Sequence, residues 1–241
     1  MEANMNVSIF PRYQTLNEEE AKRVNQERVD EQSLRNLMRR GGFFGSREWE
    51  EIYGIQVEQV ALPANVLNIL EERCPYGKEE KVKDSHFLTL IPREVTIGRM
   101  GELEGGFCKN YSYGLRQTIG GIPVPQLNAV ASHWSLMYVG SDHGLLPGSR
   151  SKSFQDQCTL MKGGYEVIPL VDAFLSILSH FRQTEERLVP DDPWSWIQCA
   201  EKYDNGWRVM MGRICGGGLC RPYCYDERGY HNLGLGVLRK F

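Results

Sequence analysis

Four side chains that bind metals lie close together near the C-terminal end of the sequence. Cys215, Cys220, Cys224 and His231 fall within seventeen positions, and they supply the sulfur and nitrogen ligands that tetrahedral zinc prefers. Their spacing differs from the Cys-x2-Cys and His-x3-His pairs of common zinc sites. The glycines at 216–218 predict a hairpin turn that would place Cys215 opposite Cys220. Structural zinc, a disulfide formed on oxidation and inert strand residues are therefore three alternatives for this loop.

Cysteine and histidine could also form a nucleophilic site elsewhere in the chain. Cys74 or Cys108 could pair with His86, His133 or His143, since such catalysis needs a thiol within hydrogen-bond reach of an imidazole. Cys74, however, follows the end of an expected helix and so lacks the helix N-terminus that often activates a catalytic thiol. A cysteine-dependent hydrolase or transferase is the alternative function, and the leading interpretation assigns no catalytic residue.

The composition argues against several classes of protein. The 28 basic and 31 acidic side chains give a net charge of −3, so the chain lacks the broad basic field typical of nucleic-acid binders. No phosphate-binding loop motif is present, and no apolar run approaches the ~20 residues of a membrane span. The N-terminus has no long apolar segment, and the seven cysteines are an odd number. We therefore expect reduced thiols in a protein that is cytoplasmic or secreted without a cleaved signal peptide.

Aromatic residues and arginines gather in the C-terminal region. Residues 201–241 carry seven basic and four acidic side chains, and Tyr, Trp and Arg are the residue types that dominate binding hot spots. We therefore predict a surface that binds a protein or glycan partner. Its candidate residues are Trp194, Trp196, Trp207, Arg208, Arg213, Arg221, Tyr223, Tyr225, Arg228 and Tyr230.

The N-terminal part predicts a polar leader and one long helix over residues 15–40. Asn17 is the expected cap, Glu20 completes a capping box, and the glycines at 41–42 end the helix. Its thin apolar stripe suggests a helix on the surface of a domain, or one that is free to bind a partner. We expect residues 1–42 to form this leader and helix, and residues 43–241 to form a single domain.

That domain is expected to begin with helices and to continue with strands. Helices are predicted over 46–53, capped by Ser46, over 64–73 and over 169–181, where His180 is interpreted as a packing residue. Buried strands are predicted over 86–92 and 132–140. The glycine-rich stretch 97–126 predicts loops and short strands and no packed helix.

The C-terminal third changes to strand-like patterns. Asn205-Gly206 lies between two β-rich runs, which predicts a hairpin, and a last strand is expected over 235–240. Helices first and antiparallel strands later predict an α+β fold with a mixed, mostly antiparallel sheet.

Several stretches together resemble an uncharacterised family of paralogous proteins from chlamydia-like intracellular bacteria. The resemblance covers about four fifths of the chain and implies a host-associated bacterial source but no activity. It rests on FFGSREWEEIYG, CPYGKEEKVKDSHFLTLIP, SHWSLMYVGSD, LPGSRSKSFQDQ, GYEVIPLVDAFLSIL, DDPWSWIQCAEKYDNGWRVMMG and the ending GVLRKF.

A second resemblance concerns the fold. GYEVIP before a helix, a Trp-rich hairpin and the ending GLGVLRKF are similar to the late half of C-type-lectin-like domains. Glu166 stands where those domains have arginine, one residue is inserted before Pro169, and no calcium-ligand pattern is present. A lectin-like fold would not itself specify a function. The sequence thus predicts a non-enzymatic binding protein of a host-associated bacterium that binds through its C-terminal surface.

Overall fold

The computed structural model describes residues 29–39, 41–104, 117–140, 142–189, 195–212 and 229–241. It confirms an α+β protein whose main sheet has five strands in the order β1-β2-β5-β10-β6. These strands are β1 (Phe43–Phe44), β2 (His86–Ile91), β5 (His133–Tyr138), β10 (Val237–Lys240) and β6 (Glu166–Val167). β1 runs parallel to β2, and the other neighbours are antiparallel.

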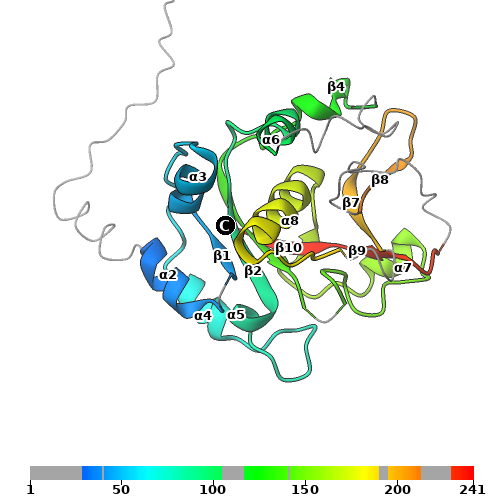
Figure 1. Ribbon diagram of the computed structural model, residues 1–241. Helices are drawn as coiled ribbons and strands as arrows, with labels where there is room; N and C mark the ends of the chain where they lie inside the picture. The colour runs from blue at the N-terminus through cyan, green and yellow to red at the C-terminus, as the bar shows by residue number, and fades with distance from the viewer. Residues whose placement is uncertain (1–28, 40, 105–116, 141, 190–194, 213–228) are drawn as a thin grey trace, which may run out of the picture.

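The longest described helix lies across this sheet. α8 (Leu170–Thr184) packs against β1, β2 and β5 (Figure 1), and all six residues of β2 are buried. The predictions over 86–92, 132–140 and 169–181 are confirmed to within three residues at each end. Continuous apolar runs indicate elements that are covered on more than one side. These three elements could therefore be predicted from the sequence.

A second sheet has the order β8-β7-β9. β7 (Trp196–Lys202) and β8 (Arg208–Met211) form the antiparallel hairpin predicted from Asn205-Gly206, and β7 pairs in parallel with β9 (Leu233–Leu235). The last strand predicted over 235–240 is confirmed as β10, which begins two residues later, because the chain passes from the second sheet to the main sheet at Gly236. A Cβ at this position would lie 2.5 Å from side-chain carbons of Ile168 and Ile197, so only glycine fits the crossing.

The N-terminal helix is shorter than the sequence predicted. α2 (Glu31–Leu37) begins after Asp30, whose extended backbone (ψ 150°) and side-chain bond to the Ser33 N–H make it the cap. The prediction of a single helix over 15–40 is therefore wrong, because the backbone at Asp30 is extended. The expected cap, Asn17, lies outside the described residues. Leu34 and Met38 are buried in the main core, so the core extends to the N-terminal side of the boundary expected at residue 43.

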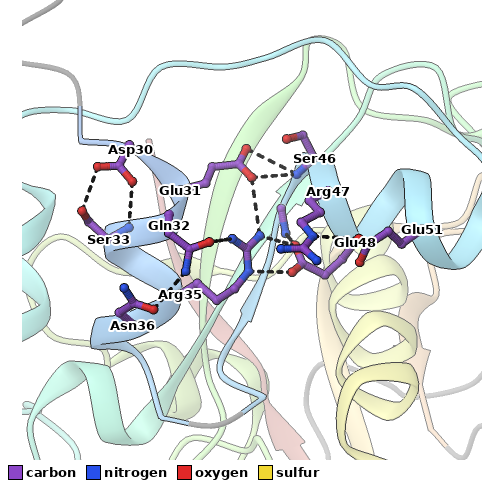
Figure 2. A network of polar contacts seen from close by, with 11 residues as sticks. Asp30, Glu31, Gln32, Ser33, Arg35, Asn36, Ser46, Arg47, Glu48 and Glu51 are labelled. Atoms are coloured by element: carbon purple, nitrogen blue, oxygen red, sulfur yellow. Dashed lines mark hydrogen bonds and ion pairs between the residues drawn. The ribbon is translucent and has the colours of Figure 1, made fainter.

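Polar contacts fasten α2 to α3 (Ser46–Tyr53), as Figure 2 shows. The Arg35 guanidinium donates two bonds to the Glu48 carboxylate, with N···O distances of 2.8 and 3.0 Å. Glu31 accepts a bond from the Ser46 N–H, at 3.1 Å. The bounds predicted for α3 are confirmed, but Gly45 occupies the cap position in place of Ser46, and its N–H donates to Glu48.

The stretch 97–126 contains a helix that the sequence did not predict. α6 (Ile97–Leu103) is capped by Thr96, whose hydroxyl accepts a bond from the Arg99 N–H, and it buries Met100. The Thr96 cap and the burial of Met100 outweigh the two glycines in α6, each of which lowers the stability of the helix by only about 1 kcal/mol. Residues 105–116 lie outside the described part. The predicted short strands are present as β3 (Thr118–Ile119) and β4 (Ile122–Pro123).

The remaining elements are short. They are α4 (Val66–Glu71), within the helix predicted over 64–73, α5 (Val82–Ser85), α7 (Phe154–Cys158) and a 3-10 turn, η2 (Val124–Gln126). Among the helices of the described residues, none has the length and apolar character needed to span a membrane.

Candidate functional site

Two residues of the predicted C-terminal surface are buried. Trp196 is 9% exposed and Arg208 is 6% exposed. The Arg208 guanidinium lies 3.4 Å from the centre of the Phe154 ring and donates a bond to the Ala200 carbonyl. The prediction that these two side chains lie on a binding surface is therefore wrong, because both take part in the packing of the second sheet.

The other candidates of this surface and of the zinc hypothesis are only partly described. Trp207 and Tyr230 are half-buried, and His231 is exposed, with its backbone carbonyl accepting a bond from Arg150. No group of metal-binding side chains occurs among the described residues. The remaining candidates, Trp194, Arg213, Arg221, Tyr223, Tyr225, Arg228, Cys215, Cys220 and Cys224, lie outside the described residues.

Among the described residues, no hydrogen bond joins Cys74 to a histidine. Cys74 is buried, and its Sγ accepts a bond from the Tyr76 N–H. His86 is fully buried, with Tyr165 Oη 2.8 Å from its Nε2 and the Val82 carbonyl 3.1 Å from its Nδ1. Since a carbonyl can only accept, Nδ1 carries the proton and Nε2 accepts from the tyrosine. Burial lowers the pKa of His86 to about 3, so this imidazole is a neutral structural group. Cys108 lies outside the described residues.

His133 forms an ion pair with the buried carboxylate of Asp172 instead of a nucleophilic site. Its Nε2 lies 2.6 Å from the Asp172 carboxylate, and its Nδ1 lies 3.0 Å from the Ala131 carbonyl. Both ring nitrogens therefore face acceptors, which favours the doubly protonated ring. Burial alone would lower the pKa of His133, but the bond to Asp172 outweighs it and raises the pKa above its usual value. Lys240 lies 3.5 Å from the same carboxylate.

This ion pair predicts a pH dependence of stability. Because the folded pKa of His133 is raised, its contribution is fully present below the unfolded value of about 6.5 and is lost as the pH rises through the folded value. We expect the difference in unfolding free energy between the wild type and His133→Gln to be largest below about pH 6.5 and to shrink as the pH rises above that value in urea titrations. A difference that stays constant over that range would contradict the ion pair.

The α8 pocket, as we name it, is a cavity of about 180 Å³ where three segments end. Its polar walls are Arg39, which follows α2, His143, from the loop after β5, and His180, Glu186 and Arg187, from the end of α8 and beyond. Gly41 (φ 76°) lets the first segment approach α8, because a Cβ there would lie 2.3 Å from Thr184 Cγ2.

His180 is held rigidly at the wall of the α8 pocket. It is 4% exposed, as the sequence predicted for a packing residue. Its Nδ1 lies 3.2 Å from the Glu186 carbonyl, and its ring meets Phe87 edge-on with 5.2 Å between the ring centroids. Burial and the charge of Arg39 lower the pKa of His180 to about 4, so the ring is neutral near pH 7.

Positive charge dominates the α8 pocket. The side chains of Arg39 and His143 are exposed and form no hydrogen bond or ion pair with any residue that the structure describes. Among the side chains that line the pocket, Arg39 and Arg187 outnumber the single carboxylate of Glu186. His143 also adopts a left-handed backbone conformation (φ 55°), and such conformations cluster at functional sites.

The sequence did not reveal this pocket. Its residues come from distant parts of the chain, and no motif links them. The only sequence signal was the position of His180 on the flank of a core helix, which is equally typical of packing.

Comparisons with protein-family models, curated proteins and solved structures found no match to this chain. The two resemblances described above remain predictions.

Proposed function

We propose that this protein is a non-enzymatic binding protein and that its α8 pocket holds a small anionic ligand. The observation that carries the proposal is the Arg39 guanidinium, which lines the pocket without a partner among the described residues. A guanidinium offers five donors in a planar fork and binds carboxylates and phosphates through two parallel bonds. Arg39 and the other charged side chains of the pocket are exposed, and an excess of positive charge there favours a ligand of opposite charge.

Neutral His180 supports binding over catalysis at this site. A general base works best when its pKa lies near the operating pH, whereas the pKa of His180 is lowered to about 4. Its imidazole therefore accepts a hydrogen bond readily but draws a proton away from a substrate only weakly. The small volume of the pocket, below the ~300 Å³ of drug-sized sites, favours a ligand with few atoms.

A titration with inorganic phosphate and with propionate tests the proposal. We expect either anion to shift the amide resonances of Val139, Gly140 and Leu188, which line the pocket. Arg39→Gln should weaken that binding about tenfold, the effect of losing about 1.4 kcal/mol of charge-assisted hydrogen bonding.

Arg47→Gln is the matched control for this titration. Arg47 is an exposed arginine on α3 that pairs with Glu51 and is not among the residues lining the pocket. Its substitution should leave the affinity unchanged. If both variants lose affinity equally, or if neither anion shifts the three resonances, the pocket does not bind anions and the proposal fails.

The C-terminal surface is a second candidate binding site, for a protein or glycan partner. Trp207 and Tyr230 are half-buried and so keep part of their rings at the surface. Trp196 and Arg208 are not part of this surface because both side chains are buried. Pull-down of a partner that depends on Tyr230 and is indifferent to Arg39 would favour this surface over the α8 pocket.

The other functional hypotheses stay open to direct tests. A cysteine-dependent hydrolase or transferase would show one hyper-reactive thiol towards an alkylating probe. Structural zinc would appear as stoichiometric metal that is lost on replacing Cys220, and a chelator would then lower the melting temperature. We further propose a host-associated bacterial protein that acts in the cytoplasm or is exported without a cleaved signal peptide.

A further inference from the structure

The chain between α3 and α4 contains a segment whose backbone is almost entirely unpaired. Residues 56–62 run without a turn or bend, and they belong to none of the sheets that the structure describes. Of their backbone groups, only the Val60 carbonyl forms a hydrogen bond with a described residue, and its donor is Trp134 Nε1 at 2.8 Å. Unpaired extended backbone is a template to which another strand can add.

This segment is held in place on the main core. Val60 packs against the core, Leu62 is buried in it, and the Trp134 indole fixes the Val60 carbonyl. In an extended segment the backbone groups of successive residues point to opposite edges. The N–H and C=O groups of Gln59 and Ala61 therefore point away from Trp134, and both residues are exposed. A template that is already fixed loses little conformational freedom when a strand adds to it.

Gln59, Val60 and Ala61 also form one wall of a cavity that we name the α2–α3 groove. Its volume is about 460 Å³, within the ~300–1,000 Å³ typical of ligand sites. The starts of α2 and α3 form the rest of it, so the full lining among the described residues is Val29, Asp30, Glu31, Ser46, Gln59, Val60 and Ala61. The unpaired backbone thus lies beside a hollow that can receive side chains.

Negative charge dominates the α2–α3 groove, because Asp30 and Glu31 line it and none of its described lining residues is basic. Hydrogen bonds from the first turn of α2 lower the pKa of Asp30, so this exposed carboxylate is ionised at neutral pH. Glu31 points towards Ser46 and accepts a bond from its N–H (Figure 2). A carboxylate can accept about four bonds, so both groups keep positions for further donors. The nearby Arg35 already donates two bonds to Glu48.

We propose that the α2–α3 groove binds an extended, basic peptide segment of a partner protein. The peptide adds as a strand along Gln59 and Ala61, and its lysine or arginine side chains contact the carboxylates of Asp30 and Glu31. In this mode of recognition, main-chain hydrogen bonds give affinity and the neighbouring pockets select side chains. The proposal goes beyond the anion site, since it involves no residue of the α8 pocket.

Three five-residue peptides test the inference in NMR titrations of the full chain. The probe is acetyl-Val-Lys-Val-Arg-Val-amide, and the first control has glutamate in place of both basic residues. The second control keeps the side chains of the probe but carries a methyl group on each residue's amide nitrogen, which removes the donors that strand pairing needs. We expect the probe to shift the amide resonances of Gln59 and Ala61 and to slow their hydrogen exchange. Each control should bind about tenfold more weakly.

The double variant Asp30→Asn, Glu31→Gln isolates the contribution of charge. Asparagine is also a good helix cap, and glutamine can still accept the bond from the Ser46 N–H, so the local structure is kept. We expect the probe to lose its preference over the glutamate peptide. Glu51→Gln is the matched control, because Glu51 is an exposed carboxylate on α3 that does not line the groove. Its substitution should leave the preference unchanged.

Hydrogen exchange of the free protein tests the other possible occupants of this edge. We expect the amides of Gln59 and Ala61 to exchange rapidly at every protein concentration. Protection at all concentrations would mean that another part of the chain covers them, and protection that grows with concentration would indicate a second copy. Either result overturns the proposal of a partner peptide.

The peptide titrations separate strand addition from the preference for basic side chains. If the basic and glutamate peptides bind equally and the N-methylated peptide does not bind, strand addition stands and the charge requirement is overturned. If all three bind equally, or if none shifts the two amides, the whole inference is overturned. If the double variant does not fold, the comparison of the probe with the glutamate peptide on the wild type decides the charge requirement. None of these results depends on Arg39, so failure here is distinct from failure of the anion site.

Discussion

Replacing Trp49 by alanine is expected to destabilise the protein by about 4 kcal/mol. The indole is fully buried, and its Nε1 donates to the Leu90 carbonyl at 2.8 Å. Its ring meets Phe44 edge-on, with 5.3 Å between the centroids. The substitution thus removes a large apolar contact between α3 and β2 and leaves a cavity. Urea titration should show a lower midpoint, and the melting temperature should fall by roughly 10 °C.

Trp49→Phe is the matched control for this substitution. Phenylalanine keeps most of the ring contacts with Phe44 but removes the donor to Leu90. We expect a loss of about 1–3 kcal/mol, the cost of an unmade buried hydrogen bond plus a smaller cavity. If Trp49→Ala costs no more than Trp49→Phe, the packing of α3 on the sheet contributes little and this account of the core is wrong.

Replacing Asp172 by alanine should cost about 3 kcal/mol. Asp172 is 2% exposed and lies between His133, at 2.6 Å, and Lys240, at 3.5 Å. Its removal leaves the half-buried His133 without its counter-charge, and that uncompensated charge is the main penalty. The free energy of unfolding in urea at about pH 6, where the histidine is charged, measures the effect.

A double-mutant cycle isolates the pair. In the background of His133→Gln, the further change Asp172→Ala should cost at least about 1 kcal/mol less than in the wild type, because the two groups contact each other. Asp172→Asn serves as the control that keeps the shape and removes the charge. Additive losses in the cycle would show that Asp172 stabilises α8 through other contacts and that the ion pair with His133 is weak.

Local patterns were enough to predict the elements that carry the main sheet. β2, β5 and α8 have runs of apolar residues whose periods follow from burial, and Asn205-Gly206 specifies the β7–β8 hairpin. α6 was missed because its two glycines suggested loops, whereas the Thr96 cap and the burial of Met100 decided the outcome. The start of α2 was misplaced because the predicted cap was Asn17, whereas Asp30 caps this helix.

The functional predictions depended on the environment of each side chain, which residue types alone do not specify. Trp196 and Arg208 belong to residue types that are common at interfaces, yet both are buried in contacts with residues far away in sequence, such as Phe154. The α8 pocket was invisible for the same reason. Arg39, His143 and His180 come together only in the folded protein, once α2, β5 and α8 have packed. No spacing of residues within the sequence indicates that they do so.

The position of β10 in the main sheet bears on how the chain reaches its native state. β10 lies between β5 and β6, and its Lys240 pairs with Ser135, far earlier in the sequence. Such distant pairings require a long loop to close, at a cost in chain entropy, before the stabilising contacts form. This requirement slows folding. Until β10 arrives, β5 presents an open edge of backbone donors and acceptors that another chain can pair with. Refolding yield should therefore depend on protein concentration, with aggregation competing against the insertion of a single four-residue strand.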